Sequence, residues 1–357
     1  MTKTETKTDK RRTVRKRKAV RTILLRILLA LLTTILIVAA ALFSVVFVFE
    51  KGPSKTARNI FCITCLETSA MKFVPHIFLS NEEVDAITSA NNIVSNDELT
   101  NTDLIKIPSK DDADADTKKD ENTDPDGDGI DIFDVSGATY KGKMMVVYDP
   151  SRVFVGTIDT FDVSLYGKKV TELCEKYNAA AGINAGGFVD ENGRYNGGMP
   201  LGIVISEGKL LNGDPSGAWD MVGITYENKL VCGYMTVQAA LNMGVRDAVY
   251  FGPTLITNGE PREQLGSGSG LNPRAAIGQR EDGAILLLTI DGRQTNSLGA
   301  SLTDVRDEME KFGAVNAYNL DGGASTTMVY NGEVLSQSPF LIGFREIPTA
   351  ILVKPQG

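Results

Sequence analysis

A run of 23 uncharged residues, Ile27 to Phe49, limits what the first part of this chain can form. In a helix that rises 1.5 Å per residue, a segment of this length spans a hydrocarbon core about 30 Å thick. A cleaved signal peptide has a shorter apolar stretch, roughly 7 to 15 residues. The run offers no polar face, so a buried soluble helix is the weaker alternative. We predict one uncleaved membrane anchor over residues 27–49.

The charges around this run are divided unevenly. Residues 1–26 contain 11 Lys or Arg against Glu5 and Asp9, a net charge of +9, whereas the whole chain carries −8 and the remainder therefore −17. Basic residues beside a span stay on the cytoplasmic side. We predict a cytoplasmic tail over residues 1–26 and a single-pass protein of the cell membrane, with everything after residue 50 outside. A nucleic-acid partner for the basic cluster is the weaker interpretation, and we expect none.

Residues 50–79 form a membrane-proximal segment that contains a C-x-x-C pair, Cys62 and Cys65. A redox C-x-x-C opens a helix beside a βαβ core, a context that this segment lacks. Incidental or bridged thiols are the favoured interpretation, and their disulfide state stays open. Cys174, on an apolar helix face, and Cys232, in an apparent strand, are typical core residues.

Residues 80–134 are rich in Asp, Asn, Thr and Lys, which predicts an acidic, flexible linker. Within it, Asp124, Asp126 and Asp128 have the spacing of a calcium loop and precede a glycine. The twelfth position is Val135, where a calcium loop has a bidentate glutamate. Calcium is therefore a weak alternative to ordinary turn chemistry, and we expect no metal or other cofactor.

Residues 135–357 alternate strand and helix patterns. They predict a single domain of the α+β class, or mixed α/β, with a mixed β-sheet and a few flanking helices. Strand patterns at residues 143–149 and 152–158 predict a hairpin, and Asn-Gly at 331–332 predicts another. A capping pattern from Ser301 to Asp304 predicts the start of a helix that ends at Gly313.

The only histidine, His76, precedes this domain, which argues against triads, Cys-His dyads and His-rich zinc sites within it. Proton transfer then falls to carboxylates, Tyr or Lys. Taken singly, each acid or arginine at a glycine turn is as compatible with a turn or a surface ion pair as with function. Together, the polar residues at the strand ends suit an anionic, hydroxyl-rich ligand. They are Asn184, Arg274, Asp291, Arg293, Asn319, Asp321, Ser325, Thr326 and Thr327.

Five stretches carry a resemblance to a known family. In chain order they are GINAGGF, FGPTLITNGE, NPRAAIG, TIDGRQTNSLGASLTDV and NLDGGASTTMVYNG. Over roughly residues 135–355 they resemble the phosphodiester glycosidase family. Three positions depart from the family pattern: Ala275 stands where a hydroxyl residue usually follows the arginine, Ala324 replaces a glycine and Thr326 replaces a serine. These departures concern substrate preference more than activity.

The resemblance implies a hydrolase that cleaves a sugar-1-phosphodiester of the N-acetylglucosamine type in envelope or exopolysaccharide material. In this interpretation Arg274 and Arg293 stabilise phosphate oxygens. Asp321 and Asp291 are the catalytic pair, one stabilising an oxocarbenium-like centre and the other activating water. Side-chain amides would hold sugar hydroxyls or an N-acetyl group, and hydroxyls would line the phosphate side. These substrate-binding residues would be Asn184, Asn319, Ser325 and Thr326.

Two other classes of function stay open. One is a non-catalytic module that binds envelope polysaccharide with the same polar residues. The other is a phosphodiesterase that cleaves P–O rather than C–O, although the histidine-poor domain offers no evident metal cage. The expected partners are a phosphodiester-linked glycan and, through one helix, the membrane. The glycan, its anomeric configuration and the oligomeric state stay open.

Overall fold

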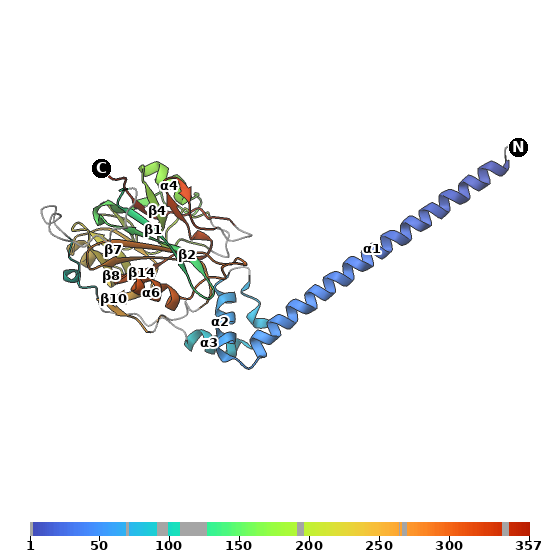
Figure 1. Cartoon of the computed structure of the whole chain (residues 1–357), viewed down its shortest axis with the longest axis horizontal. Helices are drawn as coiled ribbons and strands as arrows, with labels where there is room; N and C mark the ends of the chain where they lie inside the picture. The colour runs from blue at the N-terminus through green and yellow to red at the C-terminus, as the bar shows by residue number, and fades with distance from the viewer. Residues whose placement is uncertain are drawn as a thin grey trace.

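The computed structural model describes residues 3–68, 71–90, 99–107, 127–190, 196–263, 265, 270–337 and 343–357, without the side chains of residues 3–19 and 90. A long N-terminal helix leads through a small group of helices into a β-rich body (Figure 1). In that body, antiparallel sheets are covered by short helices. The predicted α+β class is therefore confirmed.

The N-terminal helix α1 spans Lys3–Lys51 and projects away from the body (Figure 1). Its part from Val20 to Lys51 is long and apolar enough to cross a membrane, and its most apolar window is not buried against the rest of the protein. This segment contains the anchor predicted over residues 27–49. A signal sequence near the N-terminus has the same properties.

Three short helices stand at the C-terminal end of α1: α2 (Lys55–Leu66), η2 (Pro75–Ile77) and α3 (Asn81–Ala90). Phe49 of α1 stacks on Phe61 of α2, with ring centroids 4.9 Å apart. Cys62 and Cys65 are free and buried, and Cys62 lies in an apolar cluster with Leu79 of the same segment. Burial raises the pKa of Cys65 to about 12, so these thiols are core residues rather than a redox pair.

Three sheets form the body, and every strand pair among the described residues is antiparallel. The seven-stranded sheet has the order β1 (Ile130–Ser136), β2 (Lys141–Val147), β13 (Ile285–Ile290), β12 (Arg274–Arg280), β14 (Ala314–Leu320), β10 (Thr254–Thr257), β11 (Glu260–Pro261). The second sheet has the order β16 (Glu333–Val334), β15 (Met328–Tyr330), β4 (Ala181–Asn184), β17 (Thr349–Val353), β3 (Val153–Thr157). The third has the order β6 (Lys209–Asn212), β5 (Val204–Ser206), β9 (Val245–Tyr250), β7 (Ala218–Thr225), β8 (Leu230–Thr236).

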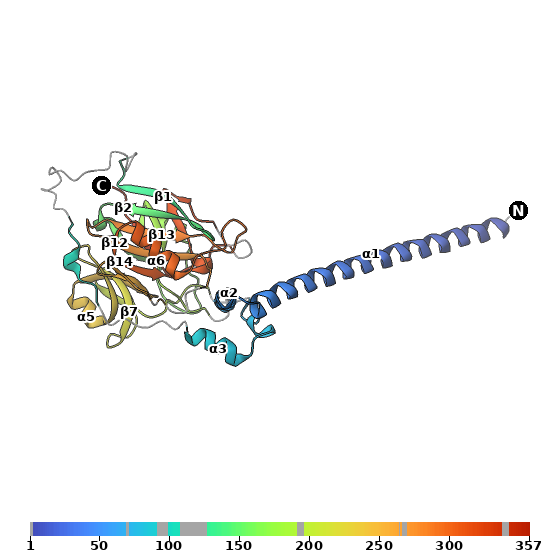
Figure 2. The same ribbon diagram turned by 60° about the horizontal axis from the view of Figure 1, so that its bottom comes forward.

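Side chains from all three sheets meet in one hydrophobic core. It contains Met145 of β2, Ile183 of β4, Val249 of β9 and Tyr318 of β14, each fully buried. Helices cover the other faces: α6 (Leu302–Lys311) lies across β12, β13 and β14 (Figure 2), α4 (Val170–Tyr177) packs on the second sheet and α5 (Val237–Asn242) on the third. Because the sheets are covered on both sides, their strand ends are rigidly placed.

Two expectations about the sheets are wrong. The strands predicted at residues 143–149 and 152–158 do not form a hairpin, because β2 joins the seven-stranded sheet and β3 joins the second. The short helix η4 (Pro150–Arg152) lies between them and redirects the chain. The sheets are also antiparallel rather than mixed, since none of the described connections returns a strand in parallel beside its neighbour.

The boundaries of the acidic linker also differ from the prediction. β1 begins at Ile130 and pairs with β2, so the body begins before residue 135. The linker prediction is wrong for residues 81–90, which form α3, whose Val84 and Ile87 are buried. The Lys106 N–H donates to the Glu281 carbonyl at 2.7 Å, so the stretch from 99 to 107 contacts the body.

Local predictions within the body are confirmed. Ser301 caps α6, and a capping box with Asp304 is present. Asn331 and Gly332 connect β15 to β16 with positive φ angles of 49° and 81°, as an Asn-Gly hairpin requires. These features depend on a few neighbouring residues, which is why sequence alone predicts them.

Candidate functional site

The candidate acids and arginines lie where β12 starts and its two neighbours, β13 and β14, end, on the same side of the seven-stranded sheet. The register pairs Arg274 with Ile290 and Ala275 with Leu320. Asp291 directly follows β13 and Asp321 directly follows β14, so both acids flank the start of β12. Since neighbouring strands lie about 4.8 Å apart, two strand spacings, roughly 10 Å, separate the backbones of the two acids.

Asp321 is held firmly at the end of β14. Its N–H donates to the Ala185 carbonyl at 3.0 Å, and its Oδ1 accepts from the Gly322 N–H at 2.9 Å. Burial raises the pKa of the Asp321 carboxyl to about 6, although hydrogen bonds from the Ser325 side chain and Gly322 oppose the shift. A carboxyl that titrates near neutrality can both accept and donate a proton, which suits general acid–base chemistry.

Asn184 connects β4 to the turn after β14. Its Nδ2 donates to the Asp321 carbonyl at 2.5 Å, and its Oδ1 accepts from the Thr327 N–H at 3.1 Å. The residue has 0% exposure. Both ends of the amide are thus bonded to backbone groups, so Asn184 holds the Asp321 turn in place, and its predicted contact with substrate stays a prediction.

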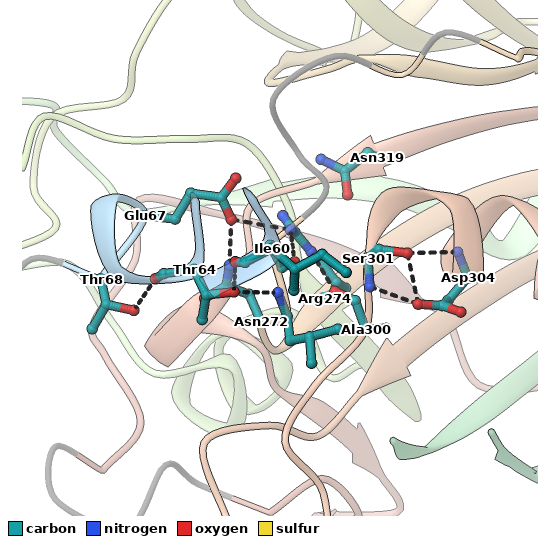
Figure 3. A network of polar contacts seen from close by, with 12 residues as sticks. Ile60, Thr64, Glu67, Thr68, Asn272, Arg274, Ala300, Ser301, Asp304 and Asn319 are labelled. Atoms are coloured by element: carbon teal, nitrogen blue, oxygen red, sulfur yellow. Dashed lines mark hydrogen bonds and ion pairs between the residues drawn. The ribbon is translucent and has the colours of Figure 1, made fainter. Parts of the chain in front are cut away.

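Arg274 lies at the start of β12 with only 8% exposure. Its Nε donates to the Ala300 carbonyl at 3.1 Å and its Nη2 to the Gly270 carbonyl at 2.8 Å. The same Nη2 lies 3.2 Å from Oε2 of Glu67, which directly follows α2 (Figure 3). The guanidinium is therefore oriented by the fold and already faces a carboxylate.

Arg293 reaches the other side of the same turn. Its Nη2 donates to Asn272 Oδ1 at 2.9 Å, while its buried Nε has no hydrogen-bond partner among the described residues. A Cβ at Gly323 would lie 3.5 Å from both terminal nitrogens of Arg293, and Gly323 has a positive φ of 64°. A side chain would make only an ordinary contact there, so the positive φ is what favours glycine, and the turn lies directly against the guanidinium.

Asp291 is more strongly built into its loop. Its Oδ1 accepts from the Gln337 N–H at 2.8 Å, and its carbonyl accepts from Ser297 Oγ at 2.6 Å. Burial raises the pKa of its carboxyl above the usual range. Asp291 therefore combines a loop-forming role with a perturbed carboxyl, whereas Asp321 adjoins both the arginine side and Asn184.

The predicted hydroxyl and amide residues are buried beside Asp321. Ser325 is hydrogen-bonded to the Asp321 carboxyl, and its carbonyl accepts from Thr327 Oγ1 at 3.0 Å. Asn319 donates through Nδ2 to the Gly252 carbonyl at 2.8 Å. The buried Thr326 Oγ1 and Asn319 Oδ1 have no hydrogen-bond partner within the part of the chain that the structure describes. Such unsatisfied groups are typical of sites that bind a ligand or water.

Sequence reasoning missed an ion pair close to Asp321. Arg345 is paired with Asp190, and its guanidinium carbon lies 4.6 Å from the ring centroid of Phe188. The Arg345 N–H donates to the Ala324 carbonyl at 3.2 Å, inside the Asp321 turn, and the positive charge lowers the pKa of Asp321. Neither Arg345 nor Asp190 follows a strand that ends in glycine, so no local pattern marks them.

A third carboxylate, Asp220 of the third sheet, lies near Asn319. Burial raises the pKa of Asp220, in β7, to about 6, and its Oδ1 has no partner among the described residues. A Cβ at Gly252 would lie 3.0 Å from its Oδ2, and the Gly252 N–H donates to the Asn319 carbonyl at 3.3 Å. Only Gly252 thus lies between Asp220 and Asn319. The sequence around Asp220, AWDMV, contains no pattern that marks a functional residue.

Within the described residues, no group of three or more His, Cys, Asp or Glu side chains could hold a metal ion. Of the weak calcium candidates, Asp124 and Asp126 lie outside the described residues. Asp128 instead accepts hydrogen bonds from the Ile130 N–H at 2.9 Å and the Tyr330 hydroxyl at 2.9 Å.

Comparison with known proteins finds a matching family and several relatives of this chain. Residues 177–354 match the family model described as phosphodiester glycosidase. The chain is 28% identical over 221 residues to mouse N-acetylglucosamine-1-phosphodiester alpha-N-acetylglucosaminidase, which covers 56% of this chain and 42% of that protein. It is 29% identical over 198 residues to the SPbeta prophage-derived uncharacterized protein YomE of Bacillus subtilis (strain 168), covering 53% of this chain and 29% of the relative. The chain thus spans less than half the length of these relatives.

Among solved structures, the similarity is one of fold. The catalytic domain of the zebrafish N-acetylglucosamine-1-phosphodiester alpha-N-acetylglucosaminidase, auto-inhibited by its pro-peptide, aligns with a TM-score of 0.52 at 23% identity. The alignment covers 64% of this chain and 82% of that chain.

Proposed function

Because residues 177–354 belong to the phosphodiester glycosidase family, we propose that the body of this protein hydrolyses a sugar-1-phosphodiester of the N-acetylglucosamine type. The observation that carries the proposal is the turn after β14. It presents a carboxyl whose pKa is raised to about 6, and at Gly323 it adjoins the guanidinium of Arg293. An acid–base group on one side and fixed positive charge on the other suit a sugar joined to a phosphate.

In the proposed reaction, water adds to the anomeric carbon while the bond from that carbon to the phosphate oxygen breaks, and a phosphomonoester leaves. A phosphomonoester is a good leaving group, so cationic stabilisation of its oxygens matters more than protonation. Arg293, assisted by Arg274, supplies this stabilisation. Asp321 accepts the proton of the attacking water, and its raised pKa matches that task near neutral pH.

A second carboxylate is needed beside the oxocarbenium-like centre. Asp291, which the sequence pairs with Asp321, is bonded through Oδ1 to a backbone N–H. Asp220 has an unpartnered Oδ1 among the described residues and lies on the Asn319 side. We keep Asp291 in the proposal and add Asp220 as the alternative for this role.

The setting of the reaction is part of the proposal. The apolar segment Val20–Lys51 would hold the body at the outer face of the cell membrane, where the positive tail keeps the N-terminus in the cytoplasm. The substrate would then be a phosphodiester-linked glycan of the envelope or an exopolysaccharide.

An isotope experiment on the full chain in detergent micelles tests the activity. Sugar-1-phosphodiesters are incubated with the protein in H₂¹⁸O, and the products are analysed by mass spectrometry. The proposal expects ¹⁸O in the sugar. Label in the phosphate would instead identify a P–O phosphodiesterase, and saturable binding without turnover would identify a polysaccharide-binding module.

A further inference from the structure

The membrane-proximal helix α2 reaches into the arginine side of the candidate site. It ends at Leu66, and Glu67 follows as its C-cap. Glu67 Oε2 lies 3.2 Å from Arg274 Nη2 and also accepts a hydrogen bond from Asn272 Nδ2 (Figure 3). Asn272 is also the residue that binds Arg293. One carboxylate oxygen therefore contacts Arg274, one of the two arginines that we assign to the phosphate of the substrate, and the asparagine that binds the other.

A second contact docks the helix next to this carboxylate. Thr64 Oγ1 accepts a hydrogen bond from the Leu271 N–H at 2.9 Å. A Cβ on Gly270 would lie 2.9 Å from the Thr64 backbone nitrogen and 2.9 Å from Glu67 Oε2, so glycine lets the loop and the helix touch. The docking is thus made by backbone contact as well as by charge.

The Glu67 carboxylate occupies the place of an anion beside Arg274 and Asn272. Burial raises the pKa of Glu67, whereas the positive charges of Arg274 and, more weakly, Arg293 lower it. The Glu67 side chain keeps 26% exposure, so this carboxylate lies at the solvent-facing edge of the site. A carboxylate and a phosphate both accept charge-assisted hydrogen bonds from guanidinium groups. Arg274 Nη2 already donates to the Gly270 carbonyl and to Glu67 Oε2, so a phosphate oxygen can take an N–H of this nitrogen only when Glu67 releases it.

We propose that α2 is an inhibitory strap whose Glu67 carboxylate occupies the phosphate position at Arg274 and Asn272, and that substrate enters this position when α2 undocks. The proposal rests on the proposed function, because it uses these residues as the phosphate site. A tethered group competes at an effective concentration in the millimolar range, so a dilute substrate is disfavoured while the strap is docked. The contacts of Glu67 and Thr64 are those of this chain, and the similarity to the zebrafish enzyme concerns the fold alone.

The strap is also connected to the membrane segment. α2 follows α1 after three residues, and Phe61 of α2 stacks on Phe49 of α1. A change in how α1 leaves the membrane would therefore move the helix that carries Glu67. Through this connection, a movement of α1 would be passed to α2 and to Glu67.

The test uses the full chain in detergent micelles and three variants: Glu67→Gln, Thr64→Val and the control Asp85→Asn. Glu67→Gln removes the competing charge, and Thr64→Val removes the docking hydrogen bond independently. Asp85 is exposed on α3, so Asp85→Asn removes one negative charge from the same segment away from the site. Binding of inorganic phosphate is measured by calorimetry, and kcat/KM is measured on a sugar-1-phosphodiester.

The strap predicts that Glu67→Gln and Thr64→Val bind phosphate about ten-fold or more tightly than the wild type, with a matching rise in kcat/KM, while Asp85→Asn changes neither. Unchanged phosphate affinity in both variants would overturn the strap. Weaker phosphate binding and slower turnover in Glu67→Gln would also overturn it, since Glu67 would then be part of the working site. If phosphate binds more tightly but no protein hydrolyses any phosphodiester, the strap stands and the proposed hydrolase fails.

Discussion

At the scale of single residues, Asp321 carries the strongest expectation. In Asp321→Asn the Oδ1 can still accept from the Gly322 N–H, so the turn is retained, but the proton-exchanging carboxyl is lost. A general acid or base is usually worth about 10² to 10⁴ in rate, and kcat should fall by that factor. Steady-state kinetics on a sugar-1-phosphodiester measure it. A folded Asp321→Asn protein with near-normal kcat removes this residue from the catalytic group.

The same carboxyl predicts how stability depends on pH. The pKa of Asp321 rises from 3.8 to about 6 on folding, so between these values the folded protein holds a proton that the unfolded chain releases. Stability therefore falls as pH rises through this window, and the penalty is complete above about pH 6. Asp321→Asn removes the penalty. Denaturant unfolding should show the variant more stable at pH 8, by on the order of 1 to 3 kcal/mol, and equally stable near pH 4.

Substitution of Arg293 tests the proposed phosphate binding separately from the sugar chemistry. Among the two arginines it is the cleaner probe, because Arg274 also holds two backbone carbonyls. We expect Arg293→Ala to lower kcat/KM on the phosphodiester. The loss of transition-state stabilisation should be about 1.5 to 3 kcal/mol, the value of a charge-assisted hydrogen bond. A sugar with a neutral activated leaving group should react almost as before. Equal losses on both substrates would show that Arg293 supports the fold instead.

At the scale of elements, the site depends on how the second sheet meets the seven-stranded sheet. Asn184→Ala leaves the Asp321 carbonyl and the Thr327 N–H without their partner. Two unsatisfied buried groups should lower the free energy of unfolding by about 2 to 4 kcal/mol, and the loosened turn should also lower kcat. Chemical denaturation and kinetics check both.

Asn212→Ala provides the matched control for this element. Asn212 also holds backbone through its amide, donating to the Gly202 carbonyl at 2.7 Å, but it lies on β6 at the edge of the third sheet. Its loss should lower stability while kcat stays normal. If both variants reduce kcat equally, the effect of Asn184 is a general one of destabilisation.

At the scale of the whole molecule, the charge division predicts the orientation in the membrane. The +9 tail should stay inside and the body outside, so protease added to intact cells should degrade the body and leave residues 1–26 protected. Immunoblots with tags at the two ends of the chain measure this. A protected body with a degraded N-terminus would reverse the topology, and a mature protein lacking the apolar segment would show that it is a signal sequence.

The sequence by itself determined the features that depend on neighbouring residues. The apolar run, the capped start of α6 at Ser301 and the Asn-Gly turn each require only a few adjacent positions. The placement of Asp321 at a strand end was also visible, because an apolar run stops there at a glycine turn. Helix periodicity, capping and turn conformations are local free-energy preferences, and for that reason they can be recognised before any tertiary structure is known.

Only the tertiary structure decided which distant residues meet. Asn184 and Asp321 are 137 positions apart, and Glu67 and Arg274 are 207 apart, so no local pattern relates them. Their contacts result from packing three sheets around one core, which sets register and orientation through many side chains together. The same packing separated β2 from β3, bonded Asn184 to the backbone of the Asp321 turn and brought Glu67, at the end of α2, to Arg274, because long-range contacts depend on the whole fold rather than on any one segment.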